Sequence, residues 1–162
     1  MWILVTGNLW GGYGIVYDGM GQVFAVISML LTGYVEEMIF RGFLFKALIP
    51  TDGIKMAIAI SSVTFGIGHI INLLAGQANV ETVIQVFFAI AWGFIFTLVF
   101  YKCESLIPCI IAHGLVNAFS VFANGGDSSL TAAWIYMGAT IVIAIVYGIY
   151  LAKLPAAENK EE

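Results

Sequence analysis

The sequence predicts an all-α fold: a polytopic transmembrane bundle of about five helices. Hydrophobic residues make up 61% of the 162 residues and charged residues only 10%, whereas ordinary soluble domains carry about 25% charged residues. The mean hydropathy is also strongly positive, at +0.99. A chain of this length holds about five apolar stretches of roughly 20 to 25 residues with short connections, which leaves no room for a second domain.

Residues 1–19 differ from the rest of the chain. A short apolar piece is followed by a run at 7–14 that is rich in Gly, Trp and Tyr. This start has no basic region and its apolar part is too short for a signal peptide. Because Trp and Tyr favour the headgroup layer of a membrane, we expect an irregular or interfacial segment, with the stump of an earlier helix as the alternative.

The first long apolar stretch predicts a helix over residues 20–49, which Pro50 and Gly53 should end. The following stretches predict helices over 54–75, 80–101, 105–122 and 130–154. In the third helix, Ala89 and Gly93 form a small-xxx-small pattern that allows a neighbouring helix to approach closely. We therefore expect one transmembrane domain at 20–154 and an acidic C-terminal tail at 155–162.

The lysines predict the orientation of the bundle. All five lie at the ends of helices on one predicted side of the membrane: Lys46, Lys55, Lys102, Lys153 and Lys160. The connections on the other side contain only Glu81 and Asp127 as charged residues. The positive-inside rule then predicts an integral protein of the cell membrane with a cytoplasmic C-terminus.

Three ionisable residues, Glu36, Glu37 and Arg41, lie together in the first apolar stretch. Each would cost about 2.5 to 3.5 kcal/mol near the middle of a bilayer, so residues of this kind usually have a function. Glu37 and Arg41 are four residues apart on one helix face and can neutralise each other. Glu36 is left over and needs a proton, a hydrogen-bond donor or a cation.

Both histidines of the chain also lie within predicted spans. At 1.5 Å per residue, Glu36, His69 and Asn117 lie roughly 18 to 21 Å from the cytoplasmic ends of their helices, and His113 about 12 Å. Asn117 shares a helix face with His113, and Phe65 shares one with His69. We therefore expect these side chains to meet in one layer of the bundle.

A glutamate, two imidazoles and an amide in one cavity are suited to hydrolysis. Glu36 could take a proton from water with the help of His69 and return it to a leaving amine. His113 and Asn117 could then donate hydrogen bonds to the oxyanion of the intermediate. Alternatively, Glu36, His69 and His113 could hold a zinc ion that activates the water. Spacing leaves both versions open.

Three motifs carry a resemblance to a known family: E-E-x-x-x-R at residues 36–41, F-x-x-x-H at 65–69 and H-x-x-x-N at 113–117. In this order on three hydrophobic helices they resemble the CPBP family of intramembrane proteases. That family groups type II CAAX prenyl proteases with bacteriocin-processing and Abi-like self-immunity proteins. The resemblance covers about residues 20–150.

The resemblance implies an endopeptidase that hydrolyses a peptide or protein substrate near the membrane face. In it, Glu36 and His69 would activate water. His113 and Asn117 would stabilise the oxyanion or bind a metal ion. The residues expected to support the site are Glu37, Arg41 and Phe65.

Two other classes of function compete with the protease. The first is a non-catalytic membrane protein that keeps the site for binding, such as an immunity protein. The second is a proton or cation transporter, because intramembrane Glu and His also mark ion pathways; the absence of an internal repeat argues against it. The net charge of −4 comes mostly from the C-terminal tail, so we expect membrane lipid but no nucleic acid as a partner.

Overall fold

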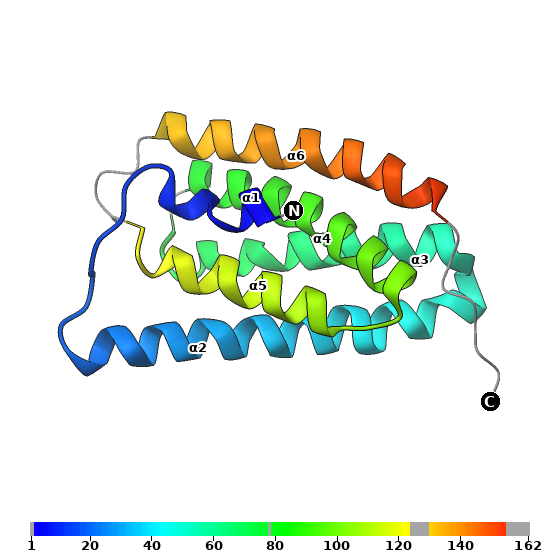
Figure 1. Ribbon diagram of the computed structural model, residues 1–162, viewed down its shortest axis with the longest axis horizontal. Coiled ribbons are helices and arrows are strands. Elements are labelled where there is room, and N and C mark those ends of the chain that lie inside the picture. Colours follow the sequence, from blue (N-terminus) through cyan, green and yellow to red (C-terminus); the bar gives the residue numbers. More distant parts are fainter. Residues whose placement is uncertain (1, 78, 124–129, 155–162) are drawn as a thin grey trace.

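Long helices run side by side along the longest axis of the computed structural model (Figure 1), which describes residues 2–77, 79–123 and 130–154. The elements are α1 (Trp2–Val5), η1 (Gly7–Leu9), α2 (Met20–Glu37), η2 (Met38–Phe45), α3 (Lys46–Gly68), η3 (His69–Leu73), α4 (Asn79–Cys103), α5 (Ile107–Ser120) and α6 (Leu130–Lys153). No β-strand occurs in these residues, and the all-α prediction is confirmed. The predicted acidic tail at 155–162 lies outside them.

The helices have the length and composition of membrane spans. Three apolar stretches are long enough to cross a bilayer: Met20–Leu73, α4 and Thr131–Lys153. The first of these has 54 residues and folds back on itself at Gly53. The Ser61 hydroxyl donates a hydrogen bond to the Phe40 carbonyl at 2.9 Å, which shows that its two arms lie side by side. With the shorter α5, five apolar segments therefore form the described bundle.

The turn between the first two spans lies later than the sequence predicted. Helical structure continues through residue 52, and the chain departs from it only at Gly53, where φ is +74° and ψ is 163°. Pro50 removes one backbone donor but keeps a φ that a helix accepts, so it does not reverse the chain. Gly53 does, because a residue without Cβ adopts a positive φ at little cost.

The helix α4 lies at the centre of the bundle, with α3 on one side and α6 on another. The prediction of a close approach at Ala89 and Gly93 is confirmed. A Cβ added to Gly93 would lie 2.9 Å from the Ser62 carbonyl oxygen, and one added to Gly66 would lie 2.8 Å from the Ile90 backbone nitrogen. Small residues on both helices thus let the backbones of α3 and α4 come together.

The N-terminal segment packs into the bundle. Leu4 and Val5 are buried among the helices. The interpretation of this segment as interfacial stays a prediction. The Tyr136 hydroxyl donates to the Leu4 carbonyl at 2.6 Å, and the Asn8 side chain donates to the Val116 carbonyl at 2.8 Å. These bonds tie α1 and η1 to α6 and α5, beside which Figure 1 shows the segment.

Candidate active site

The acidic pair and the arginine lie where α2 passes into η2. The sequence predicted an α-helix throughout, but Met38–Phe45 is a π-helix, whose backbone bonds join residues i and i+5. An apolar run of this length fits either helix, so the side-chain pattern carries no signal for the change. Such π-turns are uncommon and occur often at functional sites.

Glu37 and Arg41 form an ion pair, as their spacing predicts. Arg41 Nη1 donates to Glu37 Oε1 at 2.7 Å, and both side chains are 0% exposed. Arg41 also donates to the Thr97 hydroxyl through Nε at 3.3 Å and to the Gly93 carbonyl through Nη2 at 3.2 Å. Each guanidinium nitrogen thus has an acceptor, which a buried cation requires.

Aromatic rings cover the guanidinium. Its carbon lies 4.5 Å from the centre of the Phe65 ring and 5.5 Å from that of Phe96, within the range of cation–π attraction. Phe65 also stands edge-on between the two imidazoles, 5.3 Å from His69 and 5.4 Å from His113 between ring centres. Phe65 thereby joins the Arg41 pair to both histidines.

Glu37 has a second partner, which connects it to the cavity. Its Oε1 lies 2.8 Å from Nδ1 of His113, so that nitrogen donates to the carboxylate. The imidazole is further fixed by Phe96, which stacks on it at 5.3 Å with an angle of 25° between the rings. Glu37 thus orients His113 as well as neutralising Arg41.

This orientation turns the other nitrogen of His113 toward Glu36. His113 Nε2 lies 3.3 Å from Glu36 Oε2, and the side chains of His113 and Glu36 are 6% and 29% exposed. A proton on His113 Nε2 or on the Glu36 carboxyl would make this contact favourable, whereas two lone pairs would repel each other. The contact is therefore suited to sharing a proton, and we call Glu36 and His113 the proton-sharing pair; it lies at the edge of a cavity.

His69 lies at the first residue of η3, where α3 narrows into a 3-10 turn. Its Nδ1 is 3.1 Å from the Phe65 carbonyl oxygen. A carbonyl oxygen only accepts, so Nδ1 carries the proton and Nε2 of the neutral ring has a free lone pair. No hydrogen bond or ion pair joins His69 to Glu36 or His113 within the described ranges.

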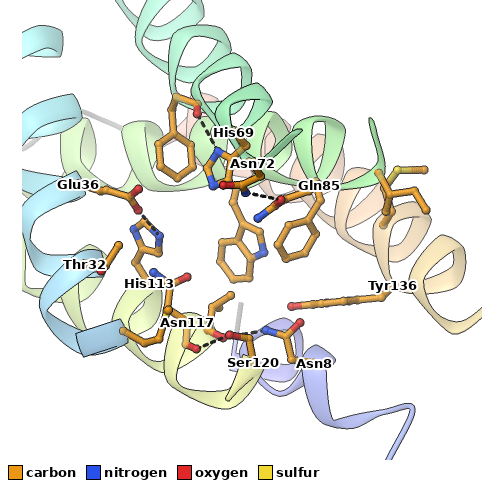
Figure 2. Close-up of a pocket in the computed structure, with 18 of the residues that line it drawn as sticks. Asn8, Thr32, Glu36, His69, Asn72, Gln85, His113, Asn117, Ser120 and Tyr136 are labelled. Carbon is orange, nitrogen blue, oxygen red and sulfur yellow. Dashed lines mark hydrogen bonds and ion pairs between the residues drawn. The ribbon is translucent and has the colours of Figure 1, made fainter. Parts of the chain in front are cut away.

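A cavity of about 490 Å³ collects these groups, a volume typical of pockets for small ligands or peptide segments. Glu36, His69, His113 and Asn117 all line it. Figure 2 shows Glu36 and His113 together on one side, with His69 beyond them. Of the site residues predicted from sequence, Glu36 and His113 are in direct contact. His69 and Asn117 line the same cavity, but in the described residues no hydrogen bond joins either of them to Glu36 or His113.

The arrangement does not fit the zinc version of the site. Among the described residues, no three His, Cys, Asp or Glu side chains are grouped so that they could hold a metal ion. Both ring nitrogens of His113 already face glutamates, at 2.8 and 3.3 Å. We therefore derive no step through a metal.

Several side chains of the site were missed from sequence. The sequence did not single out the side-chain amides of Asn72 and Gln85 as site residues, yet both line the cavity and Asn72 donates to Gln85 at 2.8 Å. Polar residues inside apolar helices are uncommon, and this alone could have marked Gln85. Thr97, which bonds Arg41, carries no such signal because threonine often satisfies itself on the helix backbone.

Comparison with known protein families gives a match. Residues 19–119 match a family model described as type II CAAX prenyl endopeptidase Rce1-like. The matched segment contains all three motifs and the whole of the proton-sharing pair. No curated protein and no solved structure matches the chain significantly.

Proposed function

The chain belongs to the type II CAAX prenyl endopeptidase Rce1-like family of integral membrane proteins, and from this premise we propose that it is itself an active endopeptidase. It would hydrolyse peptide bonds near the membrane face. The observation that supports this most is the contact between Glu36 Oε2 and His113 Nε2, 3.3 Å apart at the edge of the cavity. A general base must accept and release a proton within reach of water, and a partly exposed carboxyl beside an imidazole is suited to this.

Hydrolysis would begin when the Glu36 carboxylate takes a proton from a water molecule. The oxygen of that water then bonds to the carbonyl carbon of the substrate, and the carbonyl oxygen becomes an oxyanion. The proton passes from Glu36 to the leaving nitrogen, and the carbon–nitrogen bond breaks. No redox step or further reactant is required.

His113 and Asn117 would stabilise the oxyanion. Both line the cavity, one turn apart on α5. When the shared proton is on His113, Nε2 can donate to a developing negative charge, as can the Asn117 amide. His69, whose Nε2 lone pair is free, would accept a hydrogen bond from the attacking water and help to orient it.

The test compares peptide cleavage by wild type and by Glu36→Gln in detergent. The amide keeps the shape of the carboxyl but cannot accept the proton of water, so cleavage should fall by at least about 100-fold. Glu104→Gln, the same change at an exposed residue away from the cavity, is the matched control and should cleave normally. Equal cleavage by Glu36→Gln and wild type would contradict the mechanism. A wild type that cleaves no peptide would favour a non-catalytic protein.

A further inference from the structure

Three side-chain amides form a connected group on η3, on α4 and in the connection between them. Asn72 Nδ2 donates to Gln85 Oε1 at 2.8 Å, and Gln77 Nε2 donates to the same oxygen at 3.1 Å. An amide oxygen has two lone pairs, so these two bonds use both of them. The oxygen of Gln85 is therefore fully occupied in joining η3 and the connection after it to α4.

The side-chain nitrogen of Gln85, unlike its oxygen, takes no part in these hydrogen bonds. It carries two N–H donors, and neither bonds to another residue in the described part of the chain. Gln85 lines the cavity, and Figure 2 shows its nitrogen directed inward, across from Glu36 and His113. Since its oxygen is held from two sides, the donor is fixed in place before any ligand arrives.

The described cavity wall around this donor contains apolar side chains and no lysine or arginine. Its neighbours in the cavity wall include Ile84, Phe88 and Ala89. Apart from the two histidines, the charged residues of the described wall are Glu36 and Glu81, and it contains no Lys or Arg. A carboxylate would be buried there without a cation, which is costly, whereas a neutral carbonyl oxygen needs only one N–H.

We propose that Gln85 is a substrate-binding residue that donates a hydrogen bond to a main-chain carbonyl of the peptide being cleaved. This rests on the proposed function. Every peptide unit carries such a carbonyl, so the contact positions the chain without selecting a side chain. With Glu36 and His113 on the opposite wall, the contact would hold an uncharged, apolar stretch of peptide across the cavity. Asn72 and Gln77 would position Gln85.

Two substitutions separate this role from a purely structural one. Gln85→Glu keeps an oxygen that can accept from Asn72 and Gln77, but it replaces the donor with a second acceptor. Gln85→Leu removes both functions. The control is Gln22→Glu, because Gln22 Oε1 likewise accepts two hydrogen bonds, from the backbone nitrogens of Val16 and Tyr17, and Gln22 does not line the cavity.

The probe is a short peptide of Ala, Val and Leu, acetylated and amidated at its ends, with a fluorophore and a quencher. Its affinity is measured on detergent-solubilised Glu36→Gln protein, which holds the peptide without cutting it. Adding Gln85→Glu should weaken binding by about tenfold. Its thermal unfolding midpoint should fall no further than that of Gln22→Glu, which adds a carboxylate at another amide that accepts two hydrogen bonds. Adding Gln22→Glu should leave the affinity unchanged.

Two results would overturn the role of Gln85. One is unchanged affinity in Gln85→Glu together with weak binding in Gln85→Leu, which would show that only the oxygen matters. The other is failure of the peptide to bind the Glu36→Gln protein. Cleavage by wild type is scored separately. If the peptide binds through Gln85 but wild type never cuts it, only the endopeptidase activity is contradicted. If the Gln85→Glu protein cuts the peptide with an unchanged KM, only the role of Gln85 is contradicted.

Discussion

Glu36 and Glu37 are adjacent residues with different partners. Glu37 is 0% exposed and bonds to Arg41 and His113 through one oxygen. Glu36 is 29% exposed at the cavity, and its one ionic contact in the described residues is with His113. At the scale of single residues, Glu37 thus holds other side chains in place, whereas Glu36 is open to the cavity.

This difference predicts opposite effects for the same substitution. Glu37→Gln leaves the buried guanidinium of Arg41 without its counter-charge, so the free energy of unfolding should fall by about 3 to 5 kcal/mol. Glu36 is 29% exposed, and among the described residues no Lys or Arg side chain forms an ion pair with it. Glu36→Gln should therefore keep stability within about 1 kcal/mol of wild type. Denaturant or thermal unfolding in detergent measures both. A Glu37→Gln protein as stable as wild type but inactive would mean that the two roles are reversed.

At the scale of elements, the site depends on how closely α2 and α5 approach. A Cβ added to Gly33 would lie 2.8 Å from the Gly114 nitrogen and 2.9 Å from its Cα, so the two backbones touch there. Gly33 is three residues before Glu36, and Gly114 directly follows His113. The crossing point of the helices therefore sets the distance between the carboxyl and the imidazole.

Gly33→Ala should separate that pair. The extra methyl group meets backbone atoms that cannot rotate away, so stability should fall by about 1 to 3 kcal/mol and cleavage should fall with it. Gly138→Ala on α6 is the control, because a Cβ there meets nothing within 4 Å. It should leave cleavage and stability nearly unchanged. Unfolding and cleavage are measured on both proteins, and equal behaviour would show that the α2–α5 approach is not critical.

At the scale of the whole molecule, the described lysines gather at one end of the bundle. Lys102 Nζ donates to the Leu154 carbonyl, and Lys46 lies 5.4 Å from the Phe100 ring. Lys55 follows the turn at Gly53, and Lys153 ends α6, at the end of the bundle where α3 reverses direction (Figure 1). The lysines from which the orientation was predicted therefore also lie together at one end of the folded bundle.

We expect this lysine-rich end to face the cytoplasm, because positively charged segments are retained there during insertion. A reporter fused after Lys153 should give a cytoplasmic signal. One inserted at Gly76, in the connection at the opposite end, should give an exterior signal. Gly76 suits an insertion because a Cβ there meets nothing within 4 Å. Reversed signals at the two positions would overturn the orientation, and a full-length expression check on each fusion serves as the control.

The sequence by itself determined the apolar spans, their order and the Glu37–Arg41 pair. These depend on local properties of the chain: mean hydropathy, and a helical repeat that brings residues four apart onto one face. The turn at Gly53 lies a few residues later than predicted, and the helix predicted over 54–75 becomes a 3-10 helix at His69. Both differ because helix ends depend on backbone conformation that many side chains allow.

Only the tertiary structure decided which side chains meet. The contact of His113 with Glu37 joins residues 76 apart, and Asn72 meets Gln85 across two helices. Such contacts depend on how each helix is rotated about its axis. In a soluble protein a polar face reveals that rotation, but here both faces are apolar: on α4, Val83 is 48% exposed while its neighbour Ile84 is 7% exposed. Since lipid and protein core favour the same residue types, hydropathy cannot separate the two faces, and close packing sets the rotation instead.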